Sequence, residues 1–319
     1  HPGLRRVAIT MGPIVLGMAA FQINVLLDGV IAIGLAAPRP GETFRIFGST
    51  VEYPMRIGAN SALYFANRLM QFPLGVFGIA LATAIFPTLS SRAAREEWVG
   101  YREALTDGLG AVLFIGIPAG IGLLLLGRPA VELLFERGEF TDAMSARTTT
   151  VLAAYSTAIW AYCAHHVLAR SFYSLQDSVT PAKIAAGTVL INLTLNLTLI
   201  WWLAAAGLAL ATAISTAVQS GILYTLLIRQ TGPPDHKRLA LTLLKTLLAT
   251  ACMAGATMLV LQHMPSAPKT DDVTVKLIRL FVPVVAGATV YFLVAGTLRV
   301  PEMDLLLSVL RRKFTHRHG

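Results

Sequence analysis

Long apolar segments alternate with short polar ones along almost the whole chain. A helix that crosses a membrane needs about 20 mostly apolar residues, and eight segments reach that length. The predicted spans are residues 8–36, 61–88, 105–126, 148–170, 182–203, 206–228, 240–262 and 277–297. Each is expected to be helical, because a segment in lipid must satisfy its own backbone hydrogen bonds. The pattern therefore predicts an all-α, polytopic membrane helix bundle of about eight helices.

The composition points to the same solvent. Hydrophobic residues make up 55% of the chain and charged residues 13%, whereas soluble domains carry about 25% charged residues. The net charge is +9, but the basic residues fall between apolar runs. We therefore expect them to face phospholipid headgroups and not nucleic acid.

The distribution of positive charge predicts the orientation of the spans. If both ends of the chain lie in the cytoplasm, fifteen of the 26 lysine and arginine residues fall on the cytoplasmic side and nine on the opposite side. The remaining two, Arg68 and Lys245, fall inside spans. This bias favours cytoplasmic ends, because positive residues accumulate on that side of a membrane.

Helix breakers and small residues mark places where spans bend or approach each other. Pro73 is followed by Gly75 and Gly78, so the span 61–88 is expected to bend there. Gly116 and Gly120 are expected to allow close helix contact.

Arg68 lies about eight residues inside its span, roughly 12 Å below the outer surface. A charge in the hydrocarbon costs at least about 2.5–3.5 kcal/mol, so it suggests a functional site. The guanidinium fork binds two phosphate oxygens at once, which favours a phosphate ligand beside Arg68 and its neighbours Asn67 and Gln71. A structural ion pair with Asp28 is the alternative.

A second polar set is predicted from depth alone. Counted from the turn between the spans 182–203 and 206–228, Asn196 and Thr212 lie at nearly the depth of Asp28, and Asn192 lies one helical turn deeper. One carboxylate, two amide oxygens and a hydroxyl form an all-oxygen set that suits a hard cation such as Na⁺. Interhelical hydrogen bonding by Asn and Thr is the alternative.

Four segments carry a family resemblance. They are YFANRLMQFPLGVFGIALATAIFPTLS at 64–90, LFERGEFT at 134–141, VLARSFYSLQDSVTPAK at 167–183 and QINVLLD at 22–28. In this order, across about 230 residues, they resemble the bacterial lipid II flippase family. That family belongs to the superfamily of multidrug, oligosaccharidyl-lipid and polysaccharide exporters.

The resemblance implies that this chain is the C-terminal part of a protein with fourteen spans. The chain begins His1-Pro2-Gly3, without Met, and is expected to be a fragment. Residues 1–230 would form the second six-helix lobe, and residues 231–298 two further helices that line a groove for the lipid tail. Residues 299–319 would form a basic amphipathic tail on the cytoplasmic leaflet.

The resemblance also assigns roles to the two polar sets. Arg68 aligns with a cavity arginine thought to contact the substrate diphosphate. The family often has Asp and Glu at the positions of Asn67 and Gln71, so this cavity is expected to be more positive. A sodium site described in the family aligns with Asp28, Asn192, Asn196 and Thr212, where the position of Asn196 can be Asp. Sodium is the one cofactor expected.

The sequence therefore predicts a transporter of a bacterial inner membrane and not an enzyme. It would flip the lipid-linked peptidoglycan precursor, a polyprenyl-diphosphate-linked sugar-peptide, from the inner to the outer leaflet by alternating access. Membrane lipids and cell-wall synthesis proteins are the other expected partners. Two alternatives stay open: an exporter of another polyprenyl-linked oligosaccharide or of drugs, and a non-transporting scaffold for cell-wall enzymes.

Overall fold

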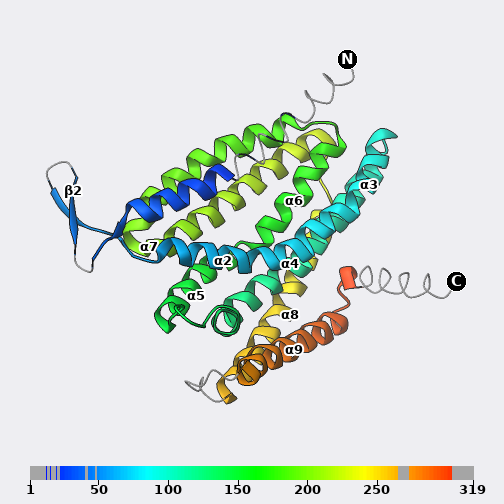
Figure 1. Cartoon of the computed structure of the whole chain (residues 1–319). Helices are drawn as coiled ribbons and strands as arrows, with labels where there is room; N and C mark the ends of the chain where they lie inside the picture. The colour runs from blue at the N-terminus through cyan, green and yellow to red at the C-terminus, as the bar shows by residue number, and fades with distance from the viewer. Residues whose placement is uncertain are drawn as a thin grey trace, which may run out of the picture.

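The structure, a computed structural model, describes residues 12, 15, 19, 22–39, 42–46, 49–264 and 273–303. It is a bundle of long helices, with four short strands near its start (Figure 1). In chain order the elements are a helix at Gln22–Gly34, β1 (Ala36–Ala37), β2 (Thr43–Ile46), β3 (Ser49–Glu52), β4 (Met55–Arg56), α2 (Ala59–Pro73), η1 (Leu74–Ile79), α3 (Ala80–Ala94), α4 (Trp98–Leu134), α5 (Asp142–Ser156), α6 (Ile159–Ser174), α7 (Val179–Thr231), α8 (His236–His263) and α9 (Val273–Thr297).

The strands form two small pairs. β1 and β4 are parallel, with Ala36 opposite Met55, while β2 and β3 are antiparallel, with Thr43 opposite Glu52. The β2–β3 ribbon projects from one end of the bundle (Figure 1).

Within the part of the chain that the structure describes, five continuous helical stretches are long and apolar enough to cross a membrane, and the prediction of a polytopic helix bundle is confirmed. One of them, α7, has 53 residues, about 80 Å at about 1.5 Å per residue. It is interrupted at Ala204, whose backbone angles are φ 49° and ψ −133°. Its two halves run antiparallel beside each other (Figure 1), since Asn192 contacts both Thr212 and Ser215. The predicted spans 182–203 and 206–228 are therefore the two halves of a helical hairpin.

The expectation of a single helix over residues 148–170 is wrong. The chain breaks between α5 and α6, where Ala158 has φ −117° and ψ 15°. Two glycines of α4 lie in close contact with the backbone at this break. A Cβ at Gly120 would lie 2.7 Å from the carbonyl oxygen of Ser156, and one at Gly116 would lie 2.9 Å from the Cα of Trp160. The close contact predicted for these glycines is thus confirmed.

The predicted bend after Pro73 is a π-helix, η1. Proline removes one backbone hydrogen-bond donor. The next six residues, Leu74–Ile79, form the wider hydrogen-bonded turns of a π-helix before α3 resumes α-helical bonding. Gly78, inside η1, is buried against α6, because a Cβ there would lie 2.9 Å from the Sγ of Cys163.

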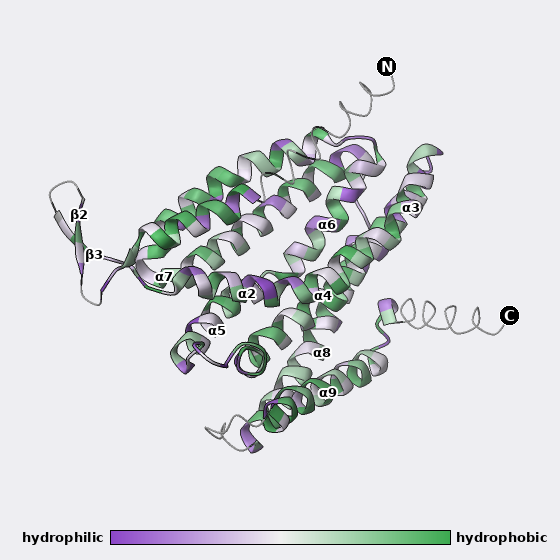
Figure 2. Cartoon of the chain, in the orientation of Figure 1, coloured by the Kyte–Doolittle hydropathy of each residue, from purple (hydrophilic) through white to green (hydrophobic). Residues whose placement is uncertain are grey.

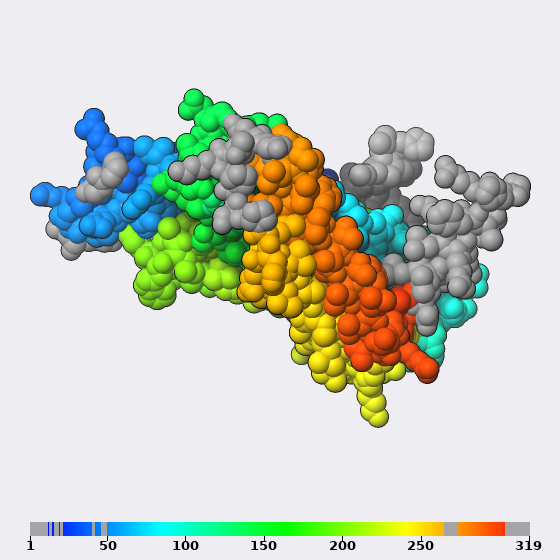
Figure 3. Space-filling view, turned by 90° about the horizontal axis from the view of Figure 1, so that it is seen from below, coloured from blue at the N-terminus to red at the C-terminus, as the bar shows by residue number. Residues whose placement is uncertain are grey.

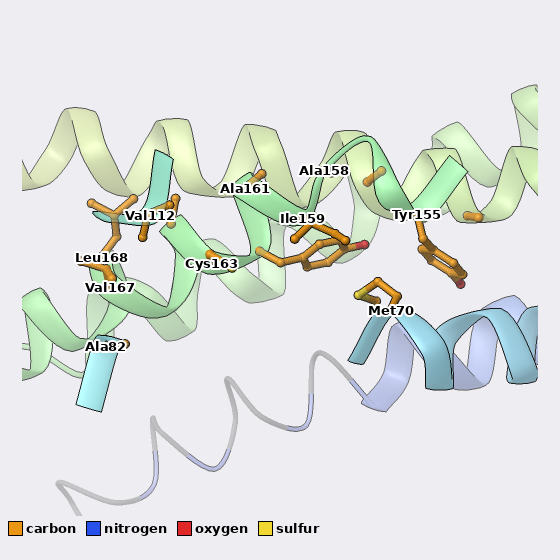
Figure 4. Close-up of a cluster of buried hydrophobic side chains, with 14 of the residues drawn as sticks. Met70, Ala82, Val112, Tyr155, Ala158, Ile159, Ala161, Cys163, Val167 and Leu168 are labelled. Carbon is orange, nitrogen blue, oxygen red and sulfur yellow. The ribbon is translucent and has the colours of Figure 1, made fainter. Parts of the chain in front are cut away.

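Two hydrophobic clusters hold the described helices together. The larger includes residues from each of the helices α2 through α7. Figure 4 shows part of it, including Met70 of α2, Tyr155 of α5 and Cys163 of α6. The smaller joins α4 to α8 and α9 through Phe114, Ala249, Met253, Tyr291, Ala295 and Val300. The predicted domain boundaries at 230 and 298 stay a prediction, and the predicted tail lies outside the described residues beyond residue 303.

The outside of the bundle is apolar. Hydrophobic residues predominate along the long helices (Figure 2). Many large apolar side chains are exposed, among them Trp202 near the break in α7, which is 82% exposed. α8 and α9 lie side by side along one face (Figure 3), and Leu293 of α9 is 65% exposed. Such side chains need lipid around them.

Candidate functional site

The helix α2 has two different faces. Ala62, Ala66 and Met70 are buried against the bundle, whereas Tyr64, Arg68 and Gln71 are exposed and Asn67 lies between the two faces. We call Tyr64, Asn67, Arg68 and Gln71 the Arg68 face. Their spacing of three and four residues places them on one side of the helix.

The described hydrogen bonds of Arg68 and Gln71 stay within α2, whereas Asn67 also hydrogen-bonds the buried Tyr155 of α5. The guanidinium of Arg68 donates to the hydroxyl of Tyr64, from Nη2 at 3.1 Å and from Nε at 3.3 Å. Gln71 Nε2 donates to Asn67 Oδ1 at 2.5 Å. Arg68 forms no ion pair within the described part of the chain, so the alternative pair with Asp28 is not seen. Guanidinium donors are left over for a ligand outside the helix.

Asp28 lies on the helix Gln22–Gly34 and is only 6% exposed. Its Oδ1 accepts from Nδ2 of Asn196 at 2.6 Å, and its Oδ2 accepts from the hydroxyl of Thr212 at 3.1 Å. These partners come from the two halves of the α7 hairpin. The carboxylate therefore links its own helix to two other helical segments of the bundle.

Asn192 completes the set. Its Nδ2 donates to the hydroxyl of Thr212 at 3.2 Å and to that of Ser215 at 3.3 Å, and its Oδ1 accepts from Nδ2 of Asn196 at 3.0 Å. All four residues chosen for their depth thus lie in one hydrogen-bonded group, which we call the Asp28 cluster together with Ser215. Sequence reasoning missed Ser215. Its position three residues after Thr212, on the same helix face, is the signal that could have found it.

The surroundings of the Asp28 cluster are buried and polar. Tyr155 and Tyr162 lie within electrostatic reach of Asp28. Asn196 Oδ1 is buried and has no hydrogen-bond partner among the described residues, whereas the buried hydroxyl of Tyr162 lies beside Thr216. A carboxylate that is buried without a cation loses several kcal/mol of solvation. The oxygen-rich set fits a hard monovalent cation, whose one charge Asp28 would balance.

The comparisons with known proteins agree with each other. The family model described as "Lipid II flippase MurJ" matches residues 1–268. A probable lipid II flippase MurJ of Vibrio cholerae serotype O1 is 34% identical over 223 residues, which cover 70% of this chain and 39% of that protein. Its counterpart in Haemophilus influenzae is 32% identical over 262 residues, which cover 80% of this chain and 47% of that protein.

Solved structures show the same fold. A lipid II flippase MurJ in an inward closed conformation superposes with a TM-score of 0.68 at 21% identity, over 95% of this chain and 56% of that one. A transporter of the MOP superfamily from Pyrococcus furiosus superposes with a TM-score of 0.56 at 14% identity, over 93% of this chain and 66% of that one. This chain thus spans about two fifths to two thirds of the length of these proteins. On the family match, the chain belongs to the lipid II flippase MurJ family.

Proposed function

We propose that this chain is the C-terminal part of a transporter that flips lipid II, the lipid-linked peptidoglycan precursor, to the outer leaflet by alternating access. The six-helix lobe would rock against a second lobe about a central cavity. Family membership supports this proposal, and the single observation that carries it is the exposed guanidinium of Arg68 within α2, which forms no ion pair among the described residues.

The Arg68 face would be one wall of the cavity. An arginine at this depth is too costly in lipid, so its face requires water, a ligand or another protein surface. Asn67 and Gln71 are neutral and hydrogen-bonded to each other, so they leave the positive charge of Arg68 uncompensated along this face. A diphosphate suits such a wall, whereas a cationic drug would require an acidic one.

The Asp28 cluster would hold the coupling ion. Asp28, Asn192, Asn196 and Thr212 would bind Na⁺ between the first helix and the α7 hairpin. The ion would favour one conformation of the lobe through its higher affinity for that conformation.

The pair α8 and α9 would guide the lipid tail. Both helices present large apolar side chains outward, among them Leu244, Leu248, Phe281, Val285 and Leu293.

We place both ends of the chain on the cytoplasmic side of a bacterial inner membrane, on the charge bias described above.

The test is complementation by the full-length protein in cells depleted of their own flippase, with precursor export measured directly. Arg68→Ala is expected to abolish growth and export, and Arg68→Lys to recover only part of both, because an ammonium does not form the bidentate contact. Arg95→Ala is the matched control, since Arg95 is an exposed arginine at the end of α3 and should behave as wild type.

Normal growth and normal export with Arg68→Ala would remove the diphosphate role. Growth that depends on Arg68 without any export of precursor would instead favour the scaffold alternative.

A further inference from the structure

Asn196 differs from the other members of the Asp28 cluster, because only one end of its amide is bonded. Its Nδ2 donates to Asp28 Oδ1 at 2.6 Å and to Asn192 Oδ1 at 3.0 Å, which uses both hydrogens. Its Oδ1 is buried and has no partner among the described residues. Buried polar atoms are nearly always hydrogen-bonded, so this oxygen requires an explanation.

The opposite orientation of the Asn196 amide is unfavourable, which explains why Nδ2, and not Oδ1, lies between Asp28 and Asn192. If the amide turned over, Oδ1 would take the place of Nδ2, 2.6 Å from one oxygen and 3.0 Å from another. Three acceptors with no hydrogen among them repel each other, so this orientation is unfavourable in the cation-free cluster. A cation placed among the same three oxygens reverses the preference, because each oxygen then becomes a ligand.

Asn192 provides the contrast one helical turn away. Its Nδ2 is held by the hydroxyls of Thr212 and Ser215, and its Oδ1 accepts from Asn196. Turning this amide would break bonds at both ends. Asn192 is thus a fixed part of the cluster, and Asn196 has one free end.

We propose that Asn196 is the moving ligand of the cation site. Its amide nitrogen bridges Asp28 and Asn192 when no cation is present, and it turns to present Oδ1 when a monovalent cation binds. The bridge stands in for the cation and lets the cluster persist without it. This inference rests on the proposed function, since it requires a cation beside Asp28. Asp28 supplies the only carboxylate of the cluster, so one positive charge balances it and a second would be left unpaired in a buried site.

The experiment uses the full-length protein, purified in detergent, and follows its melting temperature. Sodium chloride replaces choline chloride at constant ionic strength and pH, in wild type, Asp28→Asn, Asn196→Asp and Asn192→Asp. Wild type should be stabilised by sodium and Asp28→Asn should not. Asn196→Asp loses the bridging nitrogen and places two carboxylates face to face, so it should melt lowest without sodium. The sodium midpoint, the sodium concentration that gives half of the full stabilisation, should be about tenfold lower in Asn196→Asp than in wild type.

Asn192→Asp is the matched control, with the same change of charge and size. It keeps the Asn196 bridge, so its melting temperature without sodium should fall less and its midpoint should shift less. A second measurement does not depend on a variant folding: the side-chain amide NMR signals of wild type, in which sodium should move the Asn196 signal more than the Asn192 signal.

The outcomes separate the two proposals. The absence of any sodium effect in wild type would overturn the cation site and this inference with it. A sodium effect that Asp28→Asn removes, with Asn196→Asp and Asn192→Asp behaving alike, would overturn only the moving ligand. An Asn196 signal unchanged at saturating sodium would do the same.

Discussion

The Asp28 cluster and the Arg68 face are both polar groups in an apolar bundle, but they are built in opposite ways. Asp28 is buried and bonded across two other helical segments. Arg68 is exposed, and its described bonds reach only Tyr64 on the same helix. The first group is enclosed within this chain. The second would, in the function proposed above, be one wall of a site whose other wall comes from outside the described part of the chain.

Of the two groups, the Asp28 cluster is the one that this chain positions by itself. Side chains that bond across helices are held by the packing of those helices. The Asp28 cluster should therefore keep its geometry as long as the helices stay packed. Side chains bonded only along one helix gain little from tertiary structure. The Arg68 face is therefore free to meet a ligand at small cost to the fold.

The largest effect on stability is expected at Asp28. Asp28→Ala leaves the amide of Asn196 and the hydroxyl of Thr212 buried without their acceptor, and it should lower the free energy of unfolding by about 2–4 kcal/mol. Denaturation in detergent measures it. Asp28→Asn keeps one acceptor oxygen and should cost less. Equal stability of Asp28→Ala and wild type would show that the cluster does not hold the helices together.

A smaller effect is expected at Ser215. Ser215→Ala removes one of the two acceptors of Asn192 Nδ2 and should lower the free energy of unfolding by about 0.5–1.5 kcal/mol. The matched control is Ser91→Ala, at an exposed position on α3, which should change it by less than about 0.5 kcal/mol. If the two variants denature alike, Ser215 is not part of the cluster in solution.

The smallest effect on stability is expected at Arg68, where the effect on transport is expected to be greatest. Arg68→Ala should change the free energy of unfolding by less than about 0.5 kcal/mol, because the described partner is a local, exposed tyrosine. The same denaturation assay measures it. A loss as large as that of Asp28→Ala would reveal a structural partner for Arg68 and remove the contrast between the two groups.

It could be predicted that Asp28, Asn192, Asn196 and Thr212 lie close together, because a helix has a fixed rise per residue and their depths could be counted. Counting from the turn at the α7 hairpin was enough to place Asn196 and Thr212 level with each other. The break between α5 and α6 could not be predicted, because it is imposed by α4, and residues 155–160 contain neither proline nor glycine. The unpartnered oxygen of Asn196 also depends on three helices at once, so no local pattern encodes it.

The Asp28 cluster also has a consequence for the order of synthesis. Asp28 and Asn196 are 168 residues apart in sequence, which a ribosome needs roughly 8–34 s to translate at about 5–20 residues per second. During that interval the first helix is made and its carboxylate has none of its donors. The nascent helix Gln22–Gly34 therefore carries the carboxyl group of Asp28 without these partners until the α7 hairpin follows.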